Sequence, residues 1–310
     1  MSQLKRLLDF LKPNKQNKIV LSLDGGGVRA IAQIVFLKNL EVEIGKPLIE
    51  IFDLYVGTSA GAVNAACIGA QGMSCDSIEE VWSQESLNQT MSKSFWDNAS
   101  FLQTRPKYDG TGKHQILKKF FQDQSLGESK KPLVVLAYDV EKRQPRILSS
   151  YGTPGIKVVS ALTASSAAPI YYPTEQVEDG SWLIDGGIAA NNPSLVGYSE
   201  AASIFSNSNI KVLSIGTGIN RRKINGLRSR KWGALSWFRN DILGIMLESS
   251  LHHEIMINLI GQNYLRVNSP LESVNRRMDD NSESNLKRIH LMGMEWWSTF
   301  KEKAIDFVKK

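Results

Sequence analysis

Residues 21–30 read LSLDGGGVRA, a short apolar run followed by an aspartate and three consecutive glycines. The run from Lys18 to Leu23 predicts a short buried β-strand, and the segment from Val28 to Val42 has apolar residues at the spacing of a helix. The glycines therefore lie at a strand-to-helix turn. This turn is the first unit of a layered arrangement of strands and helices.

The same pattern returns at residues 52–70. A short apolar strand is predicted from Phe52 to Val56, the motif GTSAG follows it, and an Ala-rich helix is predicted from Ala60 to Ala70. Strands are also predicted at 133–138, 182–184 and 211–215, with a helix at 158–166. The alternation predicts an α/β fold with a mainly parallel central sheet, helices on both faces in three layers, and a helical C-terminal part.

The composition favours one large domain. The chain has 310 residues, of which 42 % are hydrophobic, so it can bury a substantial core. The sequence has no internal repeat and no separate linker. We expect a single domain over residues 1–310, with the core motifs at about 18–220 and a helical extension, regulatory or membrane-facing, at about 221–310.

Cysteine usage and the start of the chain predict a reducing, cytoplasmic setting. Cys67 and Cys75 make no disulfide framework, and the start MSQLKRLLDF lacks the long apolar stretch of a signal peptide. No window approaches the roughly 20 apolar residues that a membrane span needs. Contact with lipid is therefore expected to be peripheral.

The charge of the chain favours an anionic partner, which is a membrane surface or a nucleic acid, because the net charge is +6 and the isoelectric point is near 9.1. Residues 221–231 contain six basic side chains and no acid, and the apolar segment 232–247 follows them. This run suits an anionic bilayer surface, and it suits a solvated loop before a core helix equally well. The segment 4–12 has four leucines on one helical face and fits a membrane surface or docking on the domain.

The motif GTSAG at residues 57–61 indicates a nucleophile. A sharp strand-to-helix turn presents its central residue, and small neighbours let a substrate carbonyl approach. Ser59 occupies that central position. A serine just before a helix is also a common N-cap, so the motif alone leaves both interpretations open.

The glycines at 25–27 provide a second element of the candidate site. Backbone N–H groups at a glycine turn next to a helix N-terminus form a concavity that binds anions, and Arg29 adds a cation. A nucleotide phosphate is one such anion, but the sequence lacks both the Rossmann glycine spacing and the Gly-Lys-Ser/Thr ending of a phosphate-binding loop. We therefore favour an oxyanion hole that serves Ser59.

A nucleophilic serine needs a base, and Asp185 is the candidate. The chain has four histidines in helical or polar surroundings, which are His114, His252, His253 and His290. None of them follows a predicted strand, whereas Asp185 ends the short strand in WLIDGG at 182–187. A carboxylate accepts a serine proton directly when it is ionised and within hydrogen-bond reach. An Asp-Gly turn is the alternative reading of the same residues.

Three motifs occur in order, DGGGVRA at 24–30, GTSAG at 57–61 and DGG at 185–187, and with them the chain resembles the patatin-like phospholipase family. The resemblance extends to the sequences ALTASSAAPIYYP, NNPS and IGTG, so it covers roughly residues 18–220. Ala30 stands where the family often has glycine. This position enters the helix, where alanine is the better helix former, so the departure does not count against activity.

The resemblance implies a patatin-like three-layer fold and hydrolysis of fatty-acyl esters of membrane phospholipids by a Ser-Asp dyad, without a cofactor or a metal. On the matching positions, Ser59 is implied to be the nucleophile and Asp185 the general base. The implied oxyanion hole consists of Gly25, Gly26, Gly27 and Arg29. The implied partner is a phospholipid membrane surface, and no nucleic-acid polymer is expected.

Other functions stay open at this point. A general carboxylester or thioester hydrolase would use the same serine on dispersed substrates, and a non-catalytic lipid- or nucleotide-binding module would need no nucleophile. Some bacterial members of the family act in antiphage defence and are switched on by a cyclic nucleotide. A cyclic-nucleotide activator is therefore a further hypothesis, although the sequence shows no motif for such a ligand.

The remaining expectations concern packing. Four apolar residues are candidates to line an acyl channel, although most of them are expected to be plain core: Leu54, Val56, Val63 and Ile170. Trp296 and Trp297 are expected to pack inside the protein. Residues 72–112 are polar and irregular in sequence and too long for a bare connection, so we expect a mixture of helix and surface excursion there and assign no chemistry to them.

Overall fold

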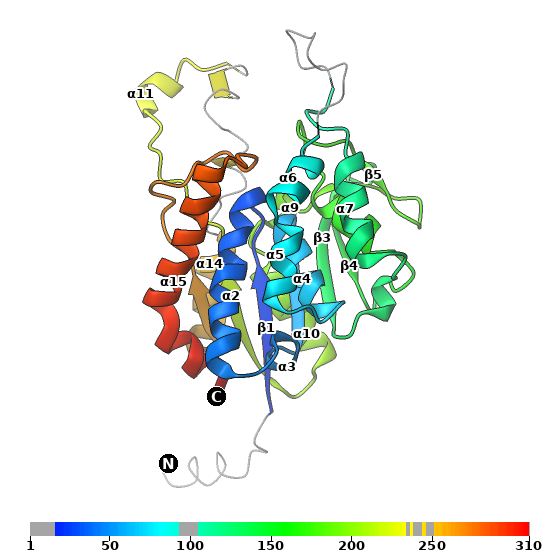
Figure 1. Ribbon diagram of the computed structural model, residues 1–310, viewed down its shortest axis with the longest axis vertical. Helices are drawn as coiled ribbons and strands as arrows, with labels where there is room; N and C mark the ends of the chain where they lie inside the picture. Colours follow the sequence, from blue (N-terminus) through cyan, green and yellow to red (C-terminus); the bar gives the residue numbers. More distant parts are fainter. Residues whose placement is uncertain (1–15, 93–104, 234–235, 238–243, 246–250, 310) are drawn as a thin grey trace, which may run out of the picture.

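The fold is described by a computed structural model that covers residues 16–92, 105–233, 236–237, 244–245 and 251–309. In these residues one eight-stranded sheet lies between helices that cover both of its faces (Figure 1). The strands are β1 Asn17–Leu23, β2 Leu54–Thr58, β3 Leu133–Asp139, β4 Gln144–Ser149, β5 Glu175–Gln176, β6 Trp182–Asp185, β7 Asn209–Ile215 and β8 Tyr264–Val267. The main helices are α2 Ile31–Ile44, α4 Ala60–Gly69, α5 Cys75–Val81, α6 Gln84–Thr90, α7 Thr111–Phe121, α8 Val158–Ser165, α10 Ser194–Ile204, α14 Leu251–Ile260 and α15 Glu283–Lys309.

The sheet is mainly parallel, as the sequence predicts. Its strand order is β5-β6-β3-β2-β1-β7-β8, and β4 also pairs with β3. The strands β3, β2, β1, β7 and β8 pair parallel with one another, whereas β4 and β6 pair antiparallel with β3, and β5 pairs antiparallel with β6. The central strands are buried on both faces, which explains why they read as continuous apolar runs rather than alternating ones.

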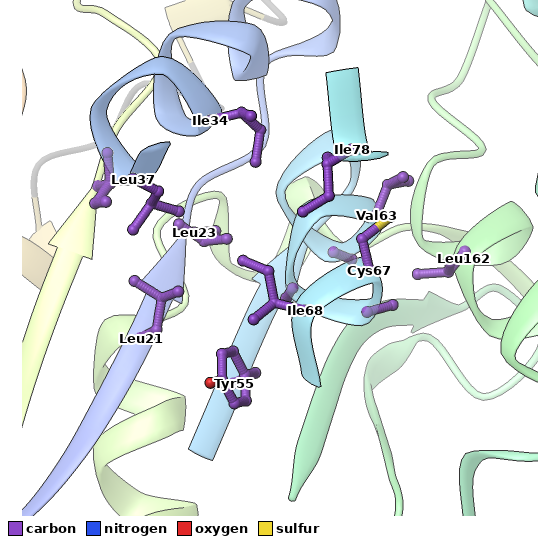
Figure 2. Packing of buried hydrophobic residues seen from close by; sticks show 14 of the residues in the cluster. Leu21, Leu23, Ile34, Leu37, Tyr55, Val63, Cys67, Ile68, Ile78 and Leu162 are labelled. Atoms are coloured by element: carbon purple, nitrogen blue, oxygen red, sulfur yellow. The ribbon is translucent and has the colours of Figure 1, made fainter. Parts of the chain in front are cut away.

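Two apolar clusters lie on opposite faces of the sheet. Leu21 and Leu23 of β1 belong to a cluster under α2, α4 and α15, which Figure 2 shows from close by. Val20, which directly precedes Leu21 and so faces the other side of the sheet, belongs to the other cluster, under α10 and α14. The alternation along one strand therefore joins the two helix layers to the sheet. Cys67 and Cys75 are free and buried, so the expectation of no disulfide is confirmed.

The residues after 220 contribute to this core. The strand β8 pairs with β7, and α15 packs so closely on α2 that a Cβ added at Gly293 would lie 2.7 Å from the Cβ of Val35. The packing expected of the two tryptophans is confirmed: Trp296 is 2 % exposed and donates a hydrogen bond to Ser269 Oγ at 2.7 Å, and Trp297 meets the ring of Phe36 edge to face at 5.6 Å.

Several expected features lie partly or wholly outside the described residues. The N-terminal segment 4–12 is one of them, and most of the apolar segment 232–247 is another. The stretch 72–112, in which helix and surface excursion are expected, contains α5, α6 and the start of α7 where it is described. Among the helices of the described ranges, every one is too short or too polar to span a bilayer.

Candidate active site

Ser59 lies at a tight turn between β2 and α4. Its backbone has φ of 54° and ψ of −126°, a conformation that non-glycine residues rarely adopt. The flanking glycines make the turn possible, because a Cβ at Gly61 would lie 2.3 Å from the carbonyl oxygen of Leu23 and a Cβ at Gly57 would lie 2.4 Å from the Cα of Ala62. Ser59 occupies the N-cap position of α4, but its side chain makes no capping hydrogen bond to that helix, so helix capping does not explain the serine.

The register of β3 brings Asp185 to this serine. On β3, Leu136 pairs with Thr58 of β2 and the next residue, Ala137, pairs with Asp185 of β6. Because β4 pairs along the other edge of β3, β2 and β6 follow one another along a single edge and meet end to end. Asp185 ends a strand as expected, but that strand runs antiparallel to β3 instead of joining the parallel row.

The two side chains are in hydrogen-bond contact. Ser59 Oγ donates to Asp185 Oδ2 at 2.7 Å, and the backbone N–H of Gly187 donates to Asp185 Oδ1, also at 2.7 Å. Burial raises the pKa of Asp185 to about 6, although the hydrogen bonds from Ser59 and Gly187 and the charge of Lys113 oppose the rise. A carboxylate with this pKa is ionised at neutral pH and is a stronger base than an exposed one.

The end of α8 supports both residues. Ser165 Oγ accepts a hydrogen bond from the Ser59 backbone N–H at 2.9 Å and donates to the Leu136 carbonyl at 2.5 Å. The backbone N–H of Asp185 donates to the Ala167 carbonyl at 3.1 Å. The sequence predicted a helix at 158–166, but it linked the end of that helix to the site only through the family resemblance. Small residues directly after a helix, SSAAP at 165–169, were the available signal of such close packing.

The glycine loop faces the serine. A Cβ at Gly25 would lie 3.2 Å from the Cβ of Ser59, and a Cβ at Gly26 would lie 2.2 Å from Thr217 Oγ1. Gly27 has φ of +58°, which favours glycine, and its missing Cβ would lie 2.1 Å from the Met278 carbonyl oxygen. The loop can approach its neighbours this closely only because it lacks side chains.

The backbone donors of the loop differ from one another. The N–H of Gly25 donates to the Asn191 carbonyl at 3.2 Å, so it is already occupied. Within the described ranges, the N–H groups of Gly26 and Gly27 donate to no protein acceptor, and both residues line the pocket that contains Ser59. Arg29 is 3 % exposed and donates from Nε to the Gly26 carbonyl at 3.3 Å, so its side chain braces the loop.

A buried ion pair lies beneath the loop. Arg266 on β8 donates from Nη1 to Asp24 Oδ1 at 2.8 Å and to Ser214 Oγ at 2.7 Å, and its Nη2 contacts Asp24 Oδ2. Asp24 directly precedes the three glycines and is 4 % exposed. Sequence reasoning missed Arg266 because 242 positions separate it from Asp24 and no local pattern connects them.

We expect Arg266→Met to lower the free energy of unfolding by about 3–5 kcal/mol, because it leaves the Asp24 carboxylate buried without its partner. Urea unfolding at neutral pH measures the change. The matched control is Arg146→Met, which removes a more exposed pair with Asp179 at 2.6 Å and should cost at most about 1 kcal/mol. Equal losses in the two variants would contradict a desolvated pair beneath the loop.

An apolar pocket opens on Ser59 and Asp185. Its apolar wall includes Val63, Val81, Trp82, Leu87, Ile116 and Leu117. Of the four candidate channel residues, Val63 lines this pocket. Leu54 and Val56 instead face the opposite side of the sheet, in the cluster under α10, and Ile170 is 39 % exposed. The expectation that most of the four would not form a channel is therefore confirmed.

A segment from the C-terminal part closes one side of the site, and we call residues 275–281 the strap. The Met278 carbonyl accepts a hydrogen bond from the Val28 N–H at 2.9 Å, next to the glycine loop. Asp279 Oδ2 accepts from the Tyr108 hydroxyl at 2.9 Å and forms an ion pair with Lys107. Met278 and Asp279 both line the pocket, so the strap forms part of its wall.

The described histidines lie outside the pocket. His252 Nδ1 lies 2.9 Å from the Asn192 carbonyl, and His253 packs against Tyr264. Among the residues that the structure describes, no histidine lines the pocket, and no group of three His, Cys, Asp or Glu side chains could hold a metal ion.

The fold and the site together define a class: a three-layer α/β protein with a serine at a strand-to-helix turn, hydrogen-bonded to a buried carboxylate beside a glycine loop. A family model described as patatin-like phospholipase matches residues 21–196. Patatin-like protein 4 of Arabidopsis thaliana is 31 % identical over 91 % of this chain and 84 % of its own length. The chain belongs to the patatin-like phospholipase family and is a lipid hydrolase.

Two further similar proteins come from bacteria. A cGAMP-activated phospholipase of Pseudomonas aeruginosa is 27 % identical, and the match covers 80 % of this chain and 77 % of that protein. The crystal structure of VipD from Legionella pneumophila has a TM-score of 0.50 at 16 % sequence identity, over 93 % of this chain and 67 % of VipD. The likeness to VipD supports the fold alone.

Proposed function

We propose that the protein is a phospholipase of the A type, which hydrolyses fatty-acyl esters of membrane phospholipids with Ser59 as nucleophile and Asp185 as general base. The hydrogen bond of 2.7 Å from Ser59 Oγ to Asp185 Oδ2 carries the proposal. Its direction is that of the proton transfer that the reaction needs, and both groups face an apolar pocket.

The reaction proceeds in two halves. Ser59 Oγ attacks the ester carbonyl carbon while Asp185 Oδ2 takes the hydroxyl proton, and the carbonyl oxygen becomes an oxyanion. The N–H groups of Gly26 and Gly27 stabilise this oxyanion, Arg29 and Gly25 hold the loop in place, and Asp185 returns the proton to the departing lyso-lipid alcohol. Water then attacks the acyl-enzyme, Asp185 accepts a proton from it, and the fatty acid leaves as Ser59 regains its hydrogen.

The pocket favours a lipid over a small soluble ester. Its wall next to Ser59 is largely apolar, which suits the acyl chain of a lipid. A general carboxylester or thioester hydrolase would need the same dyad but not this extent of apolar wall. A non-catalytic binding module would need no serine in a strained turn.

We further propose that the enzyme acts from the cytoplasm on a membrane surface. All six basic side chains of residues 221–231 are exposed. Leu227, in the same segment, is 79 % exposed. This combination supports contact with anionic headgroups, to which each basic residue adds about 1 kcal/mol near the surface. We also propose a cyclic-nucleotide activator, because the relative from Pseudomonas aeruginosa is a cGAMP-activated phospholipase.

Fatty-acid release from phospholipid vesicles tests the proposed function. We expect release from vesicles that contain anionic lipid, with EDTA present, at a higher rate than from dispersed short-chain esters. Each assay is repeated with a panel of cyclic dinucleotides, and a rate increase with one of them would support the activator. Hydrolysis of dispersed esters without any on vesicles would favour the carboxylesterase alternative. No labelling of Ser59 by a fluorophosphonate would favour the binding module.

A further inference from the structure

Lys113 is a buried cation in the wall of the active-site pocket. It lies on α7, is 6 % exposed, and lines the same pocket as Ser59 and Asp185. Its Nζ donates to the Ser166 carbonyl at 3.0 Å and to the Thr163 carbonyl at 3.3 Å. The same atom lies 3.9 Å from the centre of the Tyr172 ring. Lysine side chains are rarely buried this fully unless their charge interacts with an opposite charge.

Within the described ranges, no carboxylate lies close enough to Lys113 to form an ion pair. Asp185 and Glu175 on β5 act on it from a longer distance. The other charged groups around the pocket have partners of their own: Asp279 contacts Lys107 and Arg277, and Arg29 bonds the Gly26 carbonyl. Asp185 is therefore a main counter-charge of Lys113, and Lys113 is the cation that acts on Asp185.

The amine also reaches the part of the protein that holds the dyad. Thr163 and Ser166 lie at the C-terminal end of α8, where unsatisfied carbonyls and the helix dipole favour a positive charge. Ser165, which lies between them in the chain, accepts a hydrogen bond from the Ser59 backbone N–H through its Oγ. The carbonyl of Ala167, the residue after Ser166, accepts one from the Asp185 backbone N–H. One ammonium group thus fixes the helix end that positions both members of the dyad.

We infer that Lys113 is a positioning residue of the dyad: its ammonium fixes the end of α8 and supplies the positive charge that keeps Asp185 ionised. The inference rests on the proposed function, because it takes Asp185 to be the base. Burial lowers the pKa of Lys113 to about 7, against the attraction of Asp185 and Glu175. Over the acid limb of Asp185, whose pKa is about 6, Lys113 is therefore mostly charged.

The test is the pH dependence of Ser59 labelling by a fluorophosphonate and of fatty-acid release, between about pH 5 and pH 8. In Lys113→Met the acid limb should move up, by about one pH unit, because removal of a nearby positive charge raises the pKa of a carboxyl group. At about pH 6 the rate should therefore fall roughly five-fold, and near pH 8 the limb shift should leave it nearly unchanged. Lys119→Met, on the exposed face of the same helix, is the matched control.

Two further variants separate charge from packing. Lys113→Arg keeps the charge and should return the acid limb to its wild-type position. Lys113→Gln keeps a hydrogen-bond donor for the two carbonyls but lacks the charge, so it should show the same shift of the acid limb as Lys113→Met. It takes the place of the methionine variant if that variant fails to fold. An unmoved limb in folded Lys113→Met or Lys113→Gln would overturn the role of Lys113. Wild-type protein without any Ser59 labelling would overturn the dyad itself.

Discussion

Ser59→Ala should reduce fatty-acid release by roughly 10⁴-fold or more, and Asp185→Asn should have a comparable effect. Alanine removes the attacking oxygen, and asparagine keeps the shape of the carboxyl group but cannot take the proton from Ser59 Oγ. Because the two residues act as a unit, the double variant should be no slower than the slower single variant. The assay is release from phospholipid vesicles, and thermal unfolding monitors the fold.

The controls for this prediction are the same substitutions on the surface. Ser203→Ala lies on an exposed position of α10, and Asp76→Asn removes an exposed partner of Lys38. Both should keep wild-type activity. If the rate reductions of the two single variants multiplied in the double variant, Ser59 and Asp185 would act independently. More than about a tenth of wild-type release in Ser59→Ala would exclude this serine as the nucleophile.

Gly27→Ala should lower kcat by roughly 10²- to 10³-fold, the usual cost of losing one oxyanion donor. The new Cβ would lie 2.1 Å from the Met278 carbonyl oxygen, which is backbone and cannot rotate away, so the loop or the strap must shift. The positive φ of Gly27 adds about 1–3 kcal/mol of backbone strain to the folded state. Turnover of vesicles and urea unfolding measure the two effects separately.

Gly45 offers the matched control for this substitution. It ends α2 with φ of +69°, and a Cβ there would have nothing within 4 Å. Gly45→Ala should therefore cost about 1 kcal/mol of stability through strain and leave turnover unchanged. Wild-type turnover in Gly27→Ala would remove the loop from the proposed oxyanion hole. If Gly27→Ala and Gly45→Ala lost equal stability and neither lost turnover, the loop would likewise be removed from the proposed oxyanion hole.

Features set by local sequence were predictable. The glycine loop and Ser59 depend on turns whose neighbours are adjacent in the chain, and the apolar runs identify the central strands because these are buried on both faces. The order and direction of short strands were not predictable. The strand β6 has only four residues, and nothing in them indicates that it runs antiparallel to β3.

Long-range partners were missed for the same reason. Arg266 contacts Asp24 only through the pairing of β8 with β7 and of β7 with β1, and no motif contains both residues. Lys113 did leave a signal: it shares the apolar face of α7 with Ile116, Leu117 and Phe121, where a lysine is out of place. Such an exception to the apolar pattern is the kind of position where a functional charge is expected.

The strap determines how much of the chain a working enzyme needs. The match to the family model ends at residue 196, and the motif resemblance ends near 220, yet Met278 contacts the glycine loop and Asp279 forms part of the pocket wall. A shortened protein that ended at either boundary would retain Ser59 and Asp185 but leave the turn at Gly27 unsupported and one side of the pocket open to water. The minimal catalytic unit therefore extends past Asp279, and domain swaps between relatives need to carry this segment together with the glycine loop that it contacts.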